Sequence, residues 1–448
     1  MNNLKKIDSD TLLSAAVSFT VVCVFCACIA GFYNEIVYQR ILLGYCDILV
    51  FATMGVLFCN GMYFANKRYF AYVTFLCWVA VTFMLRGEFD LTTPVNRSHF
   101  VILCASCGVL LPMPAILKGN KKRILLDSVL FSVSLLMCVF LILAYIGLIR
   151  GENLALFHGK LTFGVTYTYT QRMMLKVLNL HYYYTGLYSA VLFFCTLYLA
   201  FSHWKGWLKL LWVFMLATLA TGVFITYSRT AVLSFTAGIL LTLYFCFFRN
   251  IKSRKFKWRA CVLSAVGGIS AAAVAMNRIY SAVNSIRDVW YGITTLSSRT
   301  IIWSAIVPLV VNNPIVLLRG LPLNNAMDTV NLYINNLDYI VHMHNSYLQT
   351  FLHLGLPGLI AIMFFMIYLL KCIKKLVEAK VHATDRQLCI VPVVIMLIGV
   401  TESNFICNPC GYEMMNLIFA LASGFIIEKA ESSRCRTDCI HCIEESEK

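Results

Sequence analysis

Residues 125–148 read LLDSVLFSVSLLMCVFLILAYIGL, and Asp127 is the only charged residue among them. A helix of about 20 apolar residues is long enough to cross the hydrocarbon core of a bilayer, which is about 30 Å thick. A transmembrane β-strand would show polar and apolar residues in alternation over about ten positions. This stretch does not alternate, so it predicts a helix that spans a membrane.

Apolar runs of this kind recur along the whole chain. The protein has 448 residues, of which 60% are hydrophobic and 13% charged, whereas about 25% of the residues of a soluble domain are charged. A soluble protein of this size has no means of hiding so much apolar surface from water. The sequence therefore predicts an all-α polytopic membrane helix bundle of about twelve transmembrane helices, at 11–33, 41–64, 69–85, 98–117, 125–148, 183–202, 207–227, 230–248, 258–276, 346–370, 388–406 and 413–427.

The positive charges predict the orientation. The net charge is +16, but Lys and Arg occur in short clusters between the apolar runs. Cytoplasmic loops of membrane proteins carry such an excess, so no nucleic-acid partner is expected. With the N-terminus inside, every predicted inner segment is positive, and these segments hold 25 of the 37 Lys and Arg residues. We expect a multi-pass protein of the bacterial inner (cytoplasmic) membrane with both termini in the cytoplasm.

Two long segments, 149–182 and 277–345, then lie outside. Loops longer than about 15 residues are uncommon in compact proteins and are usually functional or disordered. Both segments are rich in aromatic residues, so we expect them to be folded, and 301–311 is apolar enough to form a helix on the membrane or against the bundle. We therefore expect nine spans with one outer loop in 1–276, a large outer catalytic loop at 277–345, three more spans in 346–427 and a cytoplasmic tail at 428–448.

Several kinds of chemistry leave no trace in the sequence. It has no phosphate-binding loop of the ATPase type. No chain of intramembrane Asp, Glu and His indicates a proton relay. No outer acidic pair indicates a divalent cation, so no cofactor and no metal are expected. The tail contains Cys435, Cys439, His441 and Cys442, whose types suit zinc but whose spacing does not, so we expect an unstructured reduced tail. Whether Cys407 and Cys410 form a disulfide stays open.

Arginines stand out on the predicted outer face, at Arg172, Arg229, Arg278, Arg287, Arg299 and Arg319. The guanidinium group suits bidentate binding of phosphate. Arg229 lies in a short polar break between two spans, where the alternative interpretation is contact with lipid headgroups. His344 lies just before the span that begins at 346. A neutral imidazole there is suited to general-base catalysis, the alternative being a histidine that only forms an interfacial hydrogen bond.

Helix signals frame His344. Asn345 or Ser346 is placed to cap the helix that follows. Gly355–Leu356–Pro357–Gly358 predicts a kink or a close helix approach within it.

In their order and spacing, these features resemble the O-antigen ligase and polymerase family. Members show a serine–arginine pair that leads a short amphipathic helix with tryptophan, a proline and glycine turn, and a histidine–asparagine pair that opens the next span. The resemblance covers about 220–365, a third of the chain, and rests on Tyr227–Ser228–Arg229, Ser298–Arg299, Trp303, Asn313–Pro314, Arg319–Gly320, His344–Asn345–Ser346–Tyr347–Leu348–Gln349 and Gly355–Leu356–Pro357–Gly358.

The resemblance implies a metal-independent, inverting glycosyltransferase of surface polysaccharide biosynthesis (O-antigen or capsule). Such a protein moves an oligosaccharide from a polyprenyl diphosphate to an acceptor sugar hydroxyl of a glycan or lipid at the outer face of the membrane. His344 is then the base, and Asn345 and Trp303 position the acceptor. The diphosphate falls to Arg229 and Arg299, with Arg172 and Arg319 as further candidates. We place a polymerase before a ligase.

Two other classes of function remain. A transporter or flippase of the same lipid-linked glycan also suits twelve spans, but it should carry polar residues within the spans. Here the candidate residues lie in outer loops. A non-catalytic assembly scaffold is the third class, and loss of transfer on substitution of His344 and Arg299 would separate an enzyme from it.

Overall fold

The computed structural model describes part of the chain. The described residues are 17, 50–55, 57–59, 61, 74, 77–82, 86, 104–117, 119–150, 154–156, 161–167, 173–177, 182–226, 228–247, 299–322, 325–334, 340, 342–378, 382–403 and 414–446. The predicted span 258–276 lies outside these residues, as do almost all of 11–33 and much of 41–64 and 69–85. Arg172, Cys407 and Cys410 lie outside them as well.

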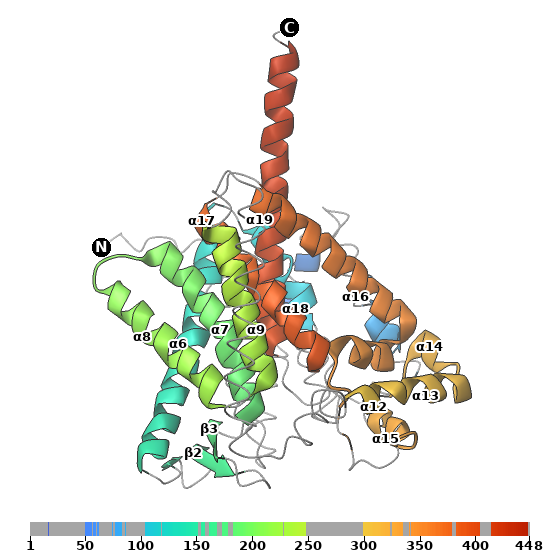
Figure 1. Cartoon of the computed structure of the whole chain (residues 1–448). Helices are drawn as coiled ribbons and strands as arrows, with labels where there is room; N and C mark the ends of the chain where they lie inside the picture. Colours follow the sequence, from blue (N-terminus) through green and yellow to red (C-terminus); the bar gives the residue numbers. More distant parts are fainter. Residues whose placement is uncertain are drawn as a thin grey trace, which may run out of the picture.

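Helices make up the body of the molecule (Figure 1). Among the described residues, five helical segments are long and apolar enough to span a membrane: Lys121–Arg150, Tyr184–His203, Leu208–Ile225, Ser346–Glu378 and Ala383–Thr401. The polytopic helical class is thereby confirmed, whereas the count of twelve spans is not. The bundle consists of η1 (Cys104–Leu110), α5 (Met113–Ile116), α6 (Lys121–Arg150), α7 (Tyr182–His203), α8 (Leu208–Ile225), α9 (Arg229–Thr242) with η2 (Leu243–Phe247), α16 (Ser346–Glu378), α17 (Ala383–Leu388), α18 (Ile390–Thr401) and α19 (Met414–Ser446).

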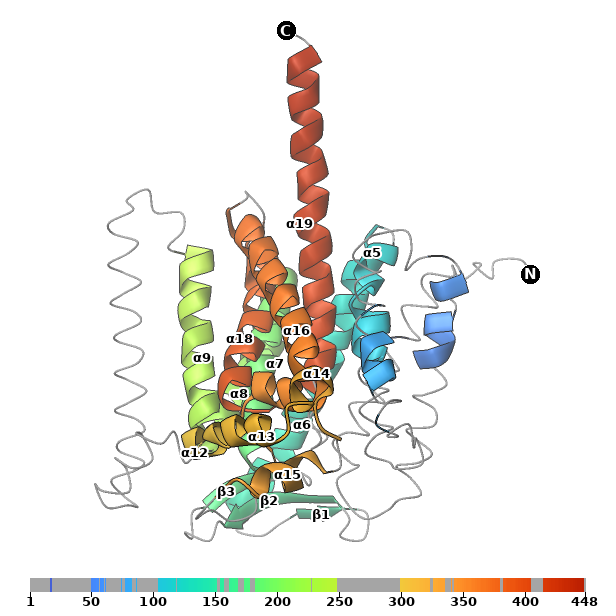
Figure 2. The same cartoon turned by 90° about the vertical axis from the view of Figure 1, so that its right-hand side faces the viewer.

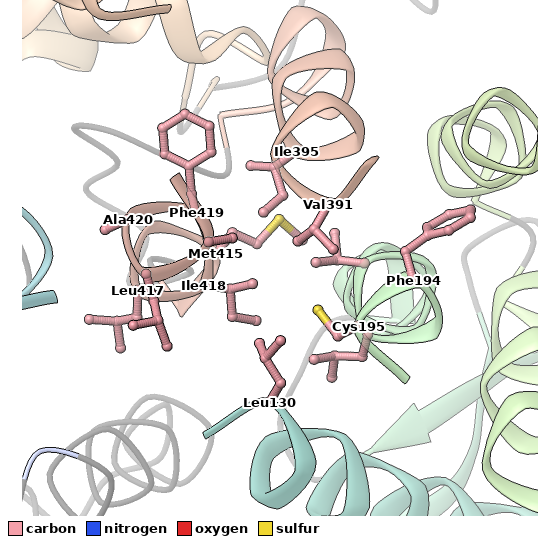
Figure 3. Close-up of a cluster of buried hydrophobic side chains, with 14 of the residues drawn as sticks. Leu130, Phe194, Cys195, Val391, Ile395, Met415, Leu417, Ile418, Phe419 and Ala420 are labelled. Carbon is pink, nitrogen blue, oxygen red and sulfur yellow. The ribbon is translucent and has the colours of Figure 1, made fainter. Parts of the chain in front are cut away.

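The core lies where α6, α7, α18 and α19 meet. Figure 3 shows Leu130 of α6, Cys195 of α7, Val391 of α18 and Ile418 of α19 pointing toward one another. All four side chains are buried, as are most side chains of α7. This packing explains why α7 carries small residues among its aromatics, because a close approach of helices in a membrane requires them.

The segment between α6 and α7 forms a small antiparallel sheet of order β1-β2-β3. Its strands are β1 (Leu154–Leu156), β2 (Leu161–Tyr167) and β3 (Met173–Val177), with Val165 opposite Leu175. The sheet contacts the end of α6 and lies beneath the bundle in Figures 1 and 2. The described part of segment 149–182, which was predicted to be an outer loop, thus adds three strands to the helical architecture.

The part of the second long loop that the structure describes contains four short helices, α12 (Arg299–Ser304), α13 (Ile306–Asn312), α14 (Val316–Arg319) and α15 (Ala326–Asn331). They lie across the same end of the bundle as the sheet, which we call the loop end (Figure 2). Ile302, Leu309 and Val316 are buried there against Phe351 and Leu352 of α16. The apolar stretch 301–311 is thus helical and packed on the bundle.

A sharp kink divides α16 near its start. Gly355 has φ +66° and ψ −169°, a conformation that is essentially restricted to glycine. Gly320, which follows α14, has φ +68°, and the two glycines let α14 and α16 come into backbone contact. The Nη1 atom of Arg86 donates to the carbonyl oxygens of Leu321 (2.7 Å) and His353 (2.6 Å), beside this contact. The kink expected from the glycine–proline sequence is confirmed.

We predict that Gly355→Ala destabilises the protein far more than Gly206→Ala. A Cβ atom at Gly355 would lie 2.5 Å from the carbonyl oxygen of Leu318, whereas nothing lies within 4 Å of one at Gly206, which also has positive φ. Strain of about 1–3 kcal/mol and overpacking of about 1–3 kcal/mol then add at Gly355. Melting in detergent measures this, and equal Tm values for the two variants would contradict it.

The C-terminal segment differs from expectation. α19 continues as one helix to Ser446 and projects from the end of the bundle opposite the loop end (Figure 1). The tail 428–448 was expected to be unstructured, and this is wrong. Ion pairs hold the helix as it leaves the bundle, from Lys122 to Glu428 (3.2 Å) and from Lys429 to Asp385 (3.4 Å).

Candidate active site

A buried carboxylate organises the candidate site. Glu402 follows the last residue of α18, and its side chain is fully buried. One oxygen, Oε1, forms an ion pair with the guanidinium of Arg299 and accepts a hydrogen bond from Thr230 Oγ1 (3.4 Å). The other, Oε2, lies 3.2 Å from Nδ1 of His344. Glu402 therefore joins the starts of α9 and α12 to the segment before α16.

Charge explains why these residues lie together. A buried carboxylate is strongly unfavourable unless it is paired and hydrogen-bonded. Arg299, whose side chain is 15% exposed, supplies the opposite charge, and His344 and Thr230 supply hydrogen bonds. The cluster is thus electrically balanced when the imidazole of His344 is neutral.

The contact with Glu402 decides the tautomer of His344. An ionised carboxylate only accepts hydrogen bonds, so the proton must lie on Nδ1 of the imidazole. The lone pair of the neutral ring is then on Nε2. The side chain is 33% exposed, so a molecule outside the protein can reach the ring. A histidine held in this way by a carboxylate is equipped to accept a proton on Nε2.

The neighbouring histidine is engaged differently. Nδ1 of His342 accepts a hydrogen bond from the backbone N–H of His344 (3.3 Å), and Nε2 lies 3.2 Å from the hydroxyl of Tyr184. The ring centroids of the two histidines are 4.0 Å apart. His342 therefore supports the loop with both ring nitrogens, and the geometry favours His344 as the base.

His344 has an unusual backbone. Its φ of +50° is the only positive value of a non-glycine residue in the described part of the chain. Such a conformation is uncommon and costs about 1–3 kcal/mol, and it persists only where surrounding contacts fix it. Here Trp303 Nε1 donates to the carbonyl oxygen of Met343 (2.9 Å), and the N–H of Asn345 donates to Ser403 Oγ (3.0 Å).

Asn345 does two further things. Its Oδ1 accepts hydrogen bonds from the backbone N–H groups of Tyr347 and Leu348 (both 2.9 Å), so it caps α16. Its Nδ2 donates to the carbonyl oxygen of Val400 (2.8 Å) and so ties the cap to α18. Asn345 and Trp303 thus form hydrogen bonds with the backbone around His344, and the role predicted for them, to position the acceptor, stays a prediction.

The predicted arginines are distributed unevenly. Arg299 is in the cluster. Arg229, half-buried, is the first residue of α9 and precedes Thr230, whose side chain contacts Glu402. Arg319 is at the far end of the α12–α14 segment, with an exposed side chain and a carbonyl oxygen that accepts from Arg86 (3.1 Å). The fourth, Arg172, lies outside the described residues.

Sequence reasoning missed Glu402. The sequence showed no intramembrane chain of Asp, Glu and His that would indicate a proton relay, and it did not connect Glu402 with His344, whose side chains lie in contact. The signal was present, since Glu402 is an acidic residue within the predicted apolar span 388–406, and such residues mark functional sites by default. Among the described residues, no group of three or more His, Cys, Asp and Glu side chains gathers as metal ligands.

The fold and the site define a multi-pass membrane protein with a histidine–carboxylate–arginine cluster under a folded loop. Residues 214–363 match the family described as O-antigen ligase. The matched segment is about a third of the chain and contains Arg229, Arg299 and His344 but not Glu402, and the match supports the resemblance to the O-antigen ligase and polymerase family. No match was found among curated proteins.

Proposed function

We propose that this protein transfers an oligosaccharide from a polyprenyl diphosphate carrier to the hydroxyl of an acceptor glycan or lipid. The observation that carries the proposal is the pairing of His344 Nδ1 with buried Glu402, which itself pairs with Arg299. That pairing makes a base of a partly exposed imidazole. The family match supports the class of reaction.

In the proposed reaction, His344 is the general base. Its Nε2 accepts the proton of the acceptor hydroxyl while the oxygen attacks the anomeric carbon, and the bond from that carbon to the diphosphate breaks. Glu402, 3.2 Å from Nδ1, stabilises the imidazolium that forms. Attack on the face opposite the departing diphosphate inverts the anomeric carbon. General-base catalysis of this kind contributes about 10²- to 10⁴-fold in rate.

The leaving group requires positive charge. Negative charge on the diphosphate grows as the glycosidic bond breaks, so cations placed there stabilise the transition state more than the ground state. Arg229 is the first candidate, because it opens α9, whose N-terminus is itself favourable for anions. Arg299 forms an ion pair with Glu402, the residue that contacts His344, and so it also helps to position the base. Arg172 and Arg319 remain further candidates for the diphosphate.

We propose that the loop end faces the outside of the bacterial inner membrane. The start of α6 (Lys121, Lys122 and Arg123) and the end of α16 (Lys371 to Lys375) place basic residues at the opposite end. Cytoplasmic ends of membrane helices carry such an excess. The site then meets donor lipid in the outer leaflet.

One experiment separates the proposed activities. Purified protein in nanodiscs receives a labelled polyprenyl-diphosphate repeat unit as its only substrate, and the products are separated on a gel. A ladder of longer glycans would establish a polymerase, which we place first. Transfer only after an acceptor lipid or protein is added would establish a ligase. Intact donor under both conditions would contradict the proposal and favour a transporter of the same lipid.

We predict that transfer persists in EDTA. Arginines supply the positive charge at the diphosphate in this mechanism, so a divalent cation is not needed for that role. The initial rate in an excess of EDTA should stay within about twofold of the rate without EDTA. Loss of activity in EDTA and its recovery on addition of Mg²⁺ or Mn²⁺ would contradict this prediction.

A further inference from the structure

Both polar backbone groups of Met343, the residue before His344, are held by side chains. Its carbonyl oxygen accepts from Trp303 Nε1 (2.9 Å), and its N–H donates to Gln349 Oε1 (2.8 Å). Met343 itself is fully buried in the apolar cluster of the loop end. This clamp therefore fixes the residue immediately before the positive-φ backbone of His344.

The hydrogen bond to Met343 also fixes how the amide of Gln349 is oriented. A backbone N–H is always a donor, so the amide atom that faces Met343 must be the oxygen. The NH₂ group of Gln349 then faces Nε2 of His353, 2.6 Å away and one helical turn further along α16. It donates to that nitrogen, so the proton of a neutral His353 is on Nδ1.

His353 is in turn fixed by its own backbone. Its carbonyl oxygen accepts from Arg86 Nη1 (2.6 Å), and a Cβ atom at Gly320 would lie 2.5 Å from its carbonyl carbon. The side chains of His353 and Gln349 are both fully buried. A chain of contacts thus leads from the kink of α16 through His353 and Gln349 to the backbone beside His344.

We propose that Gln349 and His353 are positioning residues for the base His344, acting through the backbone of Met343. Packing alone does not explain them, since leucine fills such a place without the desolvation cost of a buried amide and imidazole. Buried side chains that hydrogen-bond to one another and to the backbone rigidify their surroundings, as Gln349 does with His353 and with Met343. The inference rests on the proposed role of His344 in glycan transfer, and it adds the residues that hold the imidazole of His344 in position.

The test compares the steady-state kinetics of four variants and one control variant with labelled lipid-linked donor. Gln349→Leu leaves the Met343 N–H buried without its acceptor, so we expect kcat to fall about 10- to 100-fold, as a misplacement near 1 Å does. The KM for the donor should not change. Gln349→Glu keeps an acceptor for Met343 and should recover most of kcat. His353→Phe keeps Gln349 and should lower kcat less than Gln349→Leu does.

The double variant Gln349→Leu/His353→Phe tests most directly whether His353 acts through Gln349. If His353 acts through Gln349, the double variant should be no slower than Gln349→Leu alone. Gln387 of α17, equally buried at the opposite end of the bundle, provides the matched control, because Gln387→Leu should leave kcat unchanged. Tm values in detergent, taken for all variants, show whether each one is folded.

Two results would overturn the inference. One is a kcat for Gln349→Leu equal to that of the wild-type protein, and the other is no recovery by Gln349→Glu when both variants melt like the wild type. Failure of the proposed function looks different. In that case the wild-type protein transfers no glycan, or His344→Ala transfers as fast as the wild type.

Discussion

Replacement of His344 by asparagine is expected to reduce glycan transfer by about 10²- to 10⁴-fold, the usual contribution of a general base. Asparagine gives a stricter test than alanine at this position. It tolerates the left-handed backbone that His344 adopts (φ +50°), so the loop keeps its conformation while the imidazole is removed. His344→Ala should lose activity to a similar extent and also fold and insert.

The same substitution two residues earlier is the matched control. Nδ1 of His342 accepts from the N–H of His344, and an asparagine Oδ1 makes the same hydrogen bond two residues on. His342→Asn should therefore stay within about tenfold of the wild-type rate. Initial rates at equal amounts of folded protein measure both variants. A His342→Asn variant as slow as His344→Asn would mean that His344 is not the unique base.

The second large effect concerns the ion pair of Glu402 and Arg299, which contacts the base. Glu402→Gln removes the carboxylate that pairs with both Arg299 and His344, and it leaves a guanidinium buried without its partner. Loss of one partner of a buried ion pair costs about 3–5 kcal/mol. We expect a clear fall in Tm and, because the imidazolium is no longer stabilised, a loss of transfer comparable to that of His344→Asn.

A double variant separates stability from catalysis. Arg299→Met/Glu402→Gln removes both charges, and replacement of a whole buried ion pair by uncharged residues is often neutral for stability. The Tm should therefore return toward that of the wild type while transfer stays absent. Either single variant should melt lower than the double variant. Recovery of activity along with Tm would show that the pair serves the fold and not the reaction.

Much of the membrane bundle was predictable, because burial in lipid imposes long apolar runs. The predicted span 183–202 corresponds to α7, and the predicted span 207–227 corresponds to α8, with ends within a few residues. The break between α8 and α9 also follows from the sequence. Ser228 caps α9 with its side chain, which accepts from the N–H of Ala231 (3.3 Å).

The strands of the first outer loop were not predicted, although a signal for them exists. Residues 161–167 read LTFGVTY, in which β-branched and aromatic residues are frequent, and such residues favour strands. The aromatic residues of this loop indicate that it folds but do not say into which kind of secondary structure. A stretch of seven residues is too short to separate a strand from a loop by its period alone.

Two residues of the candidate site could be predicted from the sequence. His344 and Arg299 are recognised from local sequence, since Arg299 is the first residue of α12 and His344 directly precedes Asn345, which caps α16. Glu402 was not predicted, because its importance depends on a tertiary contact across 58 residues to His344 and 103 residues to Arg299. The same holds for Arg86, which contacts His353 across 267 positions. Local patterns carry no information about such pairings.

The most direct measurement follows a labelled glycan from its polyprenyl diphosphate carrier to an acceptor, in purified wild-type protein and in His344→Asn. We expect the wild type to move the glycan and release the polyprenyl diphosphate in equal amounts. His344→Asn should bind the same donor lipid and release almost none. Equal transfer by both proteins, or none by a folded wild type supplied with donor and acceptor, would contradict the assignment of this chain as a glycan transferase with His344 as its base.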